Sequence, residues 1–174
     1  VLDAMSRPLI GHLDPEFIAL LDRVKEGLRT VFGTGNAMTL PISATGSAGM
    51  EAAVVNLLEP GERVVVGVNG VFGGRMAEVA RRSGAEVTTV EAAWGTALDP
   101  NKMAEAIARV SPKVVAFVHA ETSTGVCQPV EAISQAARDA GAMVILDCVT
   151  SLAGRPVLLD EWQVDAAYSG TQKC

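Results

Sequence analysis

Apolar and polar positions along this chain follow two different periods, which predicts helices and strands in alternation. Between residues 14 and 32 apolar side chains recur every three to four positions, and Asp14-Pro15 provides an N-cap followed by proline, so an amphipathic helix is predicted there. Short apolar runs bounded by glycine, proline or aspartate are predicted as strands. The predicted helices are 14–32, 48–58, 70–83, 99–110 and 129–140, and the predicted strands are 38–42, 63–68, 86–90, 113–119, 143–147 and one beginning at Asp165.

The alternation of strand and helix favours a parallel sheet whose two faces are covered by helices. We therefore expect an α/β fold, a three-layer sandwich with a mainly parallel central sheet. Ligands of such sheets bind at the carboxyl ends of the strands. The polar residues that follow each predicted strand are consequently the candidates for a functional site.

Composition narrows the class of protein. The 174 residues are 49% hydrophobic, enough for one domain with a core, and the net charge of −6 argues against nucleic-acid or membrane-surface binding. No apolar run reaches the length of a membrane span and no signal peptide is recognisable, so we expect a soluble, cytoplasmic protein. The cysteines Cys127, Cys148 and Cys174 have no CxxC spacing, so neither a disulfide nor a metal site is expected.

Thr45-Gly46-Ser47 follows a predicted strand and opens a predicted helix. Backbone N–H groups at such a position, with two hydroxyls and the helix dipole, can hold a phosphate dianion. A small-residue turn with a Ser or Thr N-cap is also common in any α/β protein, and this alternative stays open. The sequence lacks GxxxxGK[ST], which disfavours a nucleotide P-loop.

Polar residues also follow the predicted strands 113–119 and 143–147. Asp147 ends an apolar run, and a carboxylate there needs a cation or strong donors, such as a protonated ring nitrogen. An N-cap, a ribose contact or a metal ligand are alternatives for Asp147. The hydroxyls of the segment 120–125 can face a ligand or form turn hydrogen bonds, and His119 is expected to be a hydrogen-bonded core histidine rather than a catalyst.

Lys173 is unusual because it follows a short strand and a Ser-Gly-Thr turn directed at the same edge of the sheet. Lysines prefer solvated helix faces. A surface lysine near the end of the chain is the alternative. The four candidate places together indicate one shared site more strongly than any of them does alone.

These residues resemble the class V aminotransferases, which depend on pyridoxal 5'-phosphate and belong to the aspartate aminotransferase fold group (fold type I). The alanine–glyoxylate and serine–glyoxylate aminotransferase branch is the most similar. The resemblance covers nearly the whole chain. It rests on the segments 10–13, 43–53, 59–62, 69–73, 121–126, 147–152 and 168–173.

The resemblance implies a role for each candidate residue. Lys173 would carry the cofactor as a Schiff base and act as the catalytic base, and Asp147 would hydrogen-bond the pyridine nitrogen. Phe72, where the branch often has tryptophan, would stack on one face of the ring and Val149 on the other. Thr122 takes the place of a serine common in the branch. The residues expected around the phosphate are Thr45, Gly46, Ser47 and Gln172.

The same resemblance implies an enzyme that moves an amino group from a small amino acid, alanine or serine, to a 2-oxo acid such as glyoxylate or pyruvate. A homodimer with shared active sites is implied as well. Because the chain starts at Val1 and stops at Cys174, just after the lysine motif, we expect residues 1–174 to be a large cofactor-binding domain without its small C-terminal domain. A substrate-binding arginine is expected in that missing part.

Several alternatives share the same motifs. An aminoethylphosphonate transaminase, a cysteine desulfurase or a lyase of the same fold would have the same lysine, aspartate and phosphate loop. A nicotinamide dehydrogenase is disfavoured because the glycines of Gly67–Gly73 do not follow the GxGxxG order. A non-catalytic relative of the fold is disfavoured by the presence of both Lys173 and Asp147.

Overall fold

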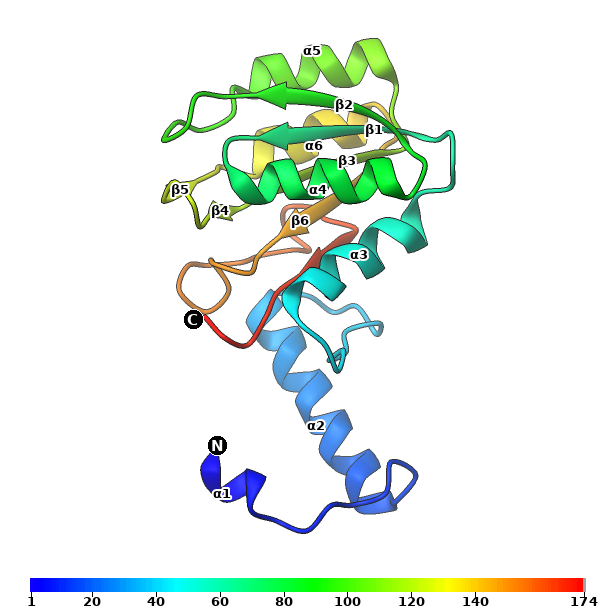
Figure 1. The fold of residues 1–174 in the computed structure, drawn as a ribbon, viewed down its shortest axis with the longest axis vertical. Helices are drawn as coiled ribbons and strands as arrows, with labels where there is room; N and C mark the ends of the chain where they lie inside the picture. Colours follow the sequence, from blue (N-terminus) through cyan, green and yellow to red (C-terminus); the bar gives the residue numbers. More distant parts are fainter. Residues whose placement is uncertain (174) are drawn as a thin grey trace.

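The computed structural model describes residues 1–173; Cys174, for which neither a disulfide nor a metal is expected, lies outside the described residues. A five-stranded sheet forms the centre of the chain (Figure 1), in the order β2-β1-β3-β6-β7. Every neighbouring pair of strands is parallel. The strands are β1 (Arg63–Val68), β2 (Glu86–Glu91), β3 (Val114–Val118), β6 (Met143–Asp147) and β7 (Ala166–Tyr168).

Helices cover both faces of the sheet. The buried apolar residues fall into two clusters, one beneath α3 (Gly46–Leu57) and α4 (Val71–Arg82), the other beneath α5 (Pro100–Val110) and α6 (Glu131–Asp139). Strand β3 is buried along its whole length because its side chains alternate between the two clusters: Phe117 joins one and Ala116 the other. The expected α/β three-layer sandwich with a parallel sheet is confirmed.

The strand order reverses direction between β1 and β3. From β1 the chain passes through α4 to the edge strand β2, and from β3 it proceeds through β6 to the opposite edge strand β7. Such a switch point leaves a crevice at the carboxyl ends of the two central strands, where parallel sheets bind ligands. The candidate ligand-binding segments are therefore those that follow β1, β3 and β6, residues 69–73, 119–122 and 147–151.

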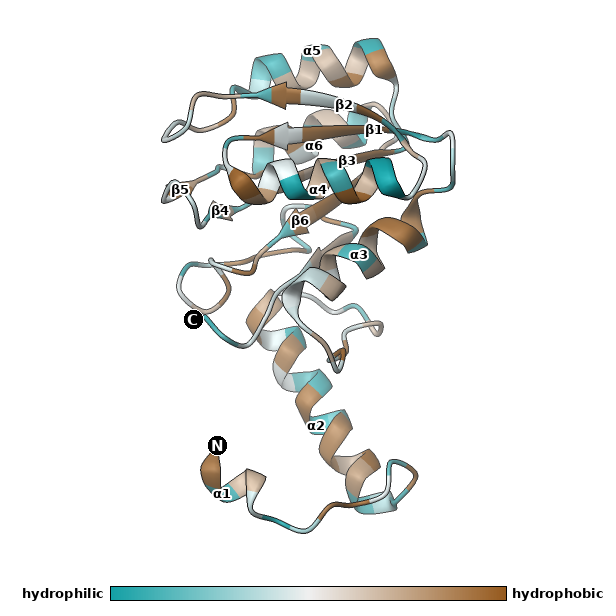
Figure 2. Cartoon of the chain, in the orientation of Figure 1, coloured by the Kyte–Doolittle hydropathy of each residue, from teal (hydrophilic) through white to brown (hydrophobic). Residues whose placement is uncertain are grey.

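Helix α2 (Pro15–Phe32) stands away from the sheet (Figure 1). None of its residues is buried, although hydrophobic residues recur along it (Figure 2). Asp14 caps it, as the sequence predicts, by accepting a hydrogen bond from the Glu16 N–H at 2.8 Å, and Gly33 ends it with φ 56°. A short helix α1 (Leu2–Met5) precedes it. Among the described residues, no helix combines the length and the apolar character needed to cross a membrane.

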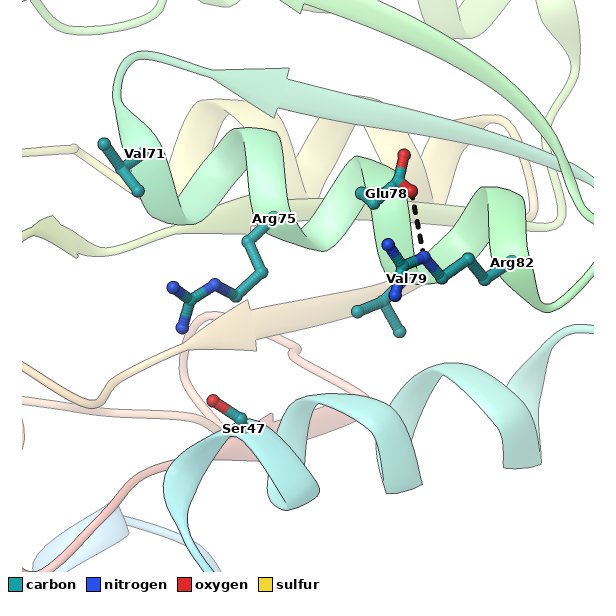
Figure 3. Close-up of a pocket in the computed structure, with 6 residues that line it drawn as sticks. All are labelled: Ser47, Val71, Arg75, Glu78, Val79 and Arg82. Carbon is teal, nitrogen blue, oxygen red and sulfur yellow. Dashed lines mark hydrogen bonds and ion pairs between the residues drawn. The ribbon is translucent and has the colours of Figure 1, made fainter.

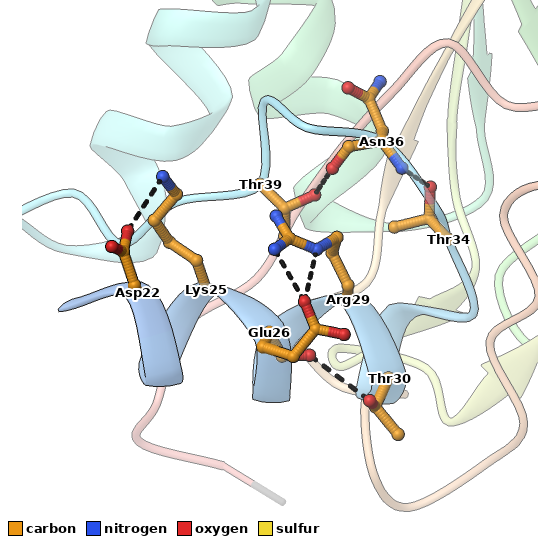
Figure 4. Close-up of polar contacts among 8 residues, drawn as sticks. All are labelled: Asp22, Lys25, Glu26, Arg29, Thr30, Thr34, Asn36 and Thr39. Atoms are coloured by element: carbon orange, nitrogen blue, oxygen red, sulfur yellow. Dashed lines mark hydrogen bonds and ion pairs between the residues drawn. The ribbon is translucent and has the colours of Figure 1, made fainter. Parts of the chain in front are cut away.

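The strand predicted at 38–42 is wrong, because this segment is irregular. The side chain of Asn36 accepts a hydrogen bond from the Met38 N–H at 2.9 Å. The Thr39 hydroxyl donates to the Asn36 carbonyl at 2.8 Å (Figure 4). These turn bonds occupy groups that a strand ladder would use, and Pro41 has no N–H to contribute. The side chain of Met38 is 82% exposed, so no apolar face is buried that could fix a strand here.

The other predicted elements agree with the structure apart from their ends. Helix α3 begins at Gly46 instead of Ala48, which places Gly46 and Ser47 in its first turn. A small antiparallel pair, β4 (Ala120–Glu121) with β5 (Val126–Cys127), was not predicted. Two-residue strands are too short to produce a readable alternation, so the sequence suggested only a polar loop there.

Candidate active site

Lys173 lies at the carboxyl edge of the sheet among residues from three other segments. Its Nζ donates to Thr122 Oγ1 at 2.5 Å and to Thr150 Oγ1 at 3.0 Å, and it lies 5.3 Å from the centroid of the Phe72 ring. Phe72 belongs to the first turn of α4, after β1, while Thr122 follows β4 and Thr150 follows β6. The structure thus brings together Lys173, Thr122 and Phe72, which the sequence singled out separately.

The partners of the Lys173 amine are neutral hydroxyls. Thr122 and Thr150 also hydrogen-bond to each other, so the amine sits on a connected pair of side chains. Within the described part of the chain no carboxylate forms an ion pair with Lys173. A hydroxyl partner orients the amine without the charge neutralisation that a carboxylate would impose.

Asp147 ends β6 with only 3% of its surface exposed. Its Oδ1 accepts a hydrogen bond from the Val149 N–H and its Oδ2 one from the Tyr168 hydroxyl, both at 2.8 Å. Burial raises the pKa of the Asp147 carboxyl above its usual range, Glu121 adds to this effect, and the two hydrogen bonds and the charge of Lys173 oppose it. The sequence-based expectation of a buried carboxylate is met.

The first turn of α3 lies close to the segment that follows Asp147. A Cβ added at Gly46 would lie 3.3 Å from Val149 Cγ2, and one added at Gly49 would lie 3.1 Å from the Cβ of Tyr168. Thr45 is the N-cap residue, but its side chain makes no capping hydrogen bond. Because the first N–H groups of a helix have no partner within the helix, this turn can offer donors to an anion.

A pocket of about 530 Å³ opens between α3 and α4 beside this turn (Figure 3). Ser47 lines it from α3, and Arg75 lines it from α4 with its guanidinium 5.1 Å from the Phe72 ring centroid. Its far end is lined by Glu78 and Arg82, which form an ion pair with 2.9 Å between Glu78 Oε1 and Arg82 Nε. Lys173 and Asp147 do not line this pocket, so it adjoins the site without containing it.

Two residues near the site have other surroundings. Gln172 is exposed, and in the described part of the chain no hydrogen bond connects it to Thr45, Gly46 or Ser47, with which it was grouped. His119 is buried, its Nδ1 hydrogen-bonds Ser151 Oγ at 2.8 Å, and burial lowers the pKa of its imidazole. His119 is therefore a core residue, as expected.

Sequence reasoning did not single out Thr150 and Tyr168. Tyr168 reaches Asp147 because the two residues are register partners in the parallel pair of β7 and β6. The register of strands far apart in sequence cannot be read from either strand alone. Thr150 gave a weak signal as one of two hydroxyl residues just after Asp147, at the edge where ligands bind.

The raised pKa of Asp147 predicts the stability of an Asn variant. A folded-state pKa above the unfolded value means that the ionised carboxylate destabilises the fold at pH 7, a cost that disappears below about pH 4. Asn can still accept from the Val149 N–H. The cofactor-free, full-length Asp147→Asn variant should therefore melt at a higher temperature than the unsubstituted protein at pH 7, and the difference should shrink on acidification.

Asp160→Asn is the matched control. The Thr34 hydroxyl and the Gly35 N–H hold the pKa of the Asp160 carboxyl below its usual range, so ionisation of this group stabilises the fold at neutral pH. Thermal melts should show a shift of the opposite sign for this variant at pH 7. A lower melting temperature for Asp147→Asn at pH 7 would contradict the account of the buried carboxylate.

The chain is similar to known proteins in sequence and in fold. Residues 4–174 match the family described as aminotransferase class-V. The chain is 43% identical to the (S)-ureidoglycine–glyoxylate transaminase of Bacillus subtilis over 174 residues, which is 100% of this chain and 42% of that protein. It is 44% identical to the alanine–glyoxylate aminotransferase of Drosophila melanogaster, with 99% of this chain and 44% of that protein covered.

A solved structure supports the same relationship. The crystal structure of an alanine–glyoxylate aminotransferase from Nostoc sp. superimposes with a TM-score of 0.94 at 45% identity, covering 97% of this chain and 45% of that one. The chain thus spans less than half the length of the relatives it matches. The family match nevertheless extends over nearly all of this chain, which belongs to the class V aminotransferase family.

Proposed function

We propose that the protein is a pyridoxal 5'-phosphate-dependent aminotransferase that transfers an amino group from a small amino acid to a 2-oxo acid such as glyoxylate. The observation that carries this proposal is the position of the Lys173 amine. The amine donates hydrogen bonds to Thr122 and Thr150 and lies beside the Phe72 ring. It lies at the same edge of the sheet as the buried Asp147, the last residue of β6. Membership of the class V aminotransferase family supports the assignment of pyridoxal 5'-phosphate as the cofactor.

The residues present fit the cofactor. Asp147 is a buried carboxylate whose ionised form is costly, and each of its oxygens keeps a lone pair beyond the one protein donor it already has. A protonated ring nitrogen would supply the missing cation. Phe72 offers an aromatic face near Lys173, and the first turn of α3 offers N–H donors for a phosphate.

We assign the residues on this basis. Lys173 would hold the cofactor aldehyde, and Asp147 the pyridine nitrogen. Phe72 and Val149 would enclose the ring, with Thr122 beside the amine. The proposed phosphate group of residues consists of Thr45, Gly46, Ser47 and Gln172, of which Gly46 has the most direct support because it packs on Val149.

The cofactor, when bound, supplies an electron sink for the carbanion left when a proton is removed from the substrate Cα. Lys173, once the substrate amine has displaced it from the cofactor, would act as the base that takes this proton and as the acid that returns it at another carbon. Thr122 and Thr150 orient the amine for both transfers. Asp147 would keep the proton on the ring nitrogen of the bound cofactor, which makes the electron sink effective. Phe72 and Val149 would hold the ring in place.

The substrates are proposed from the relatives. The two similar proteins described above are named for transfer to glyoxylate from ureidoglycine and from alanine. We propose glyoxylate as the amino acceptor and leave the donor to experiment. Residues 1–174 would form the large cofactor-binding domain, and further parts of the protein would supply the substrate-binding arginine.

We also propose a homodimer in the cytoplasm. Apolar side chains are exposed along residues 1–42, and exposed apolar surface of this extent marks an interface. A second copy is the proposed occupant, as the family resemblance implies. The most exposed of these apolar residues are Val1, Leu2, Met5, Leu9, Leu13 and Met38.

The proposed cytoplasmic location agrees with the state of the two described cysteines. Cys127 and Cys148 are free, which suits a reducing compartment.

The first test is amino transfer by the full-length protein. Incubated with glyoxylate and alanine, serine or ureidoglycine in turn, it should form glycine with at least one donor. Lys173→Ala should lower this rate by roughly 10²- to 10⁴-fold, the usual contribution of a general base. Lys102→Ala, at an exposed position on α5, should leave the rate unchanged. Absence of glycine with every donor would refute glyoxylate as the acceptor.

The second test is the oligomeric state. The side chains of Leu9 and Leu13 are 102% and 77% exposed, so charges there would disrupt contacts with a second copy. In analytical ultracentrifugation the full-length protein should sediment as a dimer, and the double variant Leu9→Glu, Leu13→Glu as a monomer. Trp94→Glu, at an exposed position after β2, should stay dimeric. If the double variant remains dimeric, the segment that contains Leu9 and Leu13 does not form the interface.

A further inference from the structure

Glu121 is a buried carboxylate that joins two parts of the site. It is 1% exposed and lies in β4, and both of its oxygens accept hydrogen bonds. Oε2 accepts from the N–H groups of Phe72 at 3.1 Å and Gly73 at 3.2 Å. Oε1 accepts from the Ser123 N–H at 3.1 Å and the Ser123 hydroxyl at 2.7 Å. Four donors thus converge on one side chain.

These contacts cap helix α4 from outside. Its N-cap residue, Gly70, has no side chain, and the Val71 N–H donates to Ser123 Oγ at 2.9 Å. The turn 121–123 therefore satisfies the first three N–H groups of α4, and its charge is favourable at the positive end of the helix dipole. Gly70 is required for this approach, because an added Cβ would lie 2.5 Å from Ser123 Oγ and closer still to Glu121 Cγ.

The two segments that Glu121 connects both touch the Lys173 amine. One carries Phe72, whose ring centroid is 5.3 Å from Nζ, and the other carries Thr122, which accepts a hydrogen bond from Nζ. We propose that Glu121 is a positioning residue that fixes Phe72 and Thr122 relative to Lys173. The inference rests on the proposed function and deepens it, because it assigns a role to a residue that makes no hydrogen bond to Lys173 or Asp147 in the described part of the chain.

The chemistry of the contacts requires a carboxylate. All four surrounding groups donate, and an ionised carboxylate only accepts. In Glu121→Gln an NH₂ group would face either the two N–H groups of α4 or the N–H and hydroxyl of Ser123, so at least one backbone N–H would lose its acceptor. The substitution keeps the size of the side chain, so its effect reports on the hydrogen bonds and the charge.

The experiment compares full-length Glu121→Gln with the unsubstituted protein, each with bound pyridoxal phosphate. We expect kcat per bound cofactor to fall roughly tenfold or more, since small misplacement near reacting groups has effects of this order. KM should change less than kcat. The circular dichroism of the bound chromophore should change as well. Hydrogen exchange of the peptide containing Val71, Phe72 and Gly73 should accelerate about tenfold or more, since the negative charge that caps α4 is lost whichever way the amide faces.

Two further variants complete the test. Ser123→Ala removes only the hydroxyl contacts, should fold even if Glu121→Gln does not, and should give smaller changes in the same direction. Glu105→Gln, exposed on α5, is the control for loss of one negative charge and should match the unsubstituted protein.

The outcomes separate the two proposals. Suppose that the unsubstituted protein is active. If kcat per bound cofactor, dichroism and hydrogen exchange of Glu121→Gln and Ser123→Ala then stay within twofold of its values, the role of Glu121 is overturned. If Glu121→Gln does not fold, unchanged kcat per bound cofactor, dichroism and exchange in Ser123→Ala are sufficient to overturn the role of Glu121. If the unsubstituted protein binds no pyridoxal phosphate, the proposed function fails instead.

Discussion

The buried carboxylate of Asp147 is the constraint on which the rest of the site depends. A charge at the end of a central strand is costly unless donors or a cation meet it, and here the Val149 N–H and the Tyr168 hydroxyl do so in part. Tyr168 ties β6 to β7 and packs against Gly49 of α3. Strand β7 leads directly to Lys173. A single costly group therefore fixes the relative positions of Lys173, the sheet edge and the first turn of α3.

The two sides of the site are held by different means. On one side, α3 approaches closely because Gly46 and Gly49 have no Cβ to collide with Val149 and Tyr168. On the other side, α4 is held by the hydrogen bonds of Glu121. Close packing and buried hydrogen bonds both resist displacement, which suits the proposed role, in which the site would hold the cofactor while its covalent bond to Lys173 breaks and re-forms.

The fold could largely be predicted from the sequence, and the site only in part. Strands such as 143–147 and capped helices such as 14–32 carry local signals, which is why their positions agree with the structure. The strand predicted at 38–42 is wrong because the apolar residues of this segment are not buried by any part of the chain that the structure describes. Contacts between distant segments, such as Tyr168 with Asp147 or Glu121 with α4, depend on strand register and loop geometry, and no single stretch of sequence encodes them.

Borohydride reduction of the full-length protein with bound pyridoxal phosphate, followed by mass spectrometry of its peptides, tests the central claim most directly. The account predicts that the reduced cofactor is attached to the peptide containing Lys173, and that Lys173→Ala retains no attached cofactor. Attachment instead at Lys25, Lys102 or Lys113, or no attachment in the unsubstituted protein, would contradict the assignment of Lys173 and with it the proposed site.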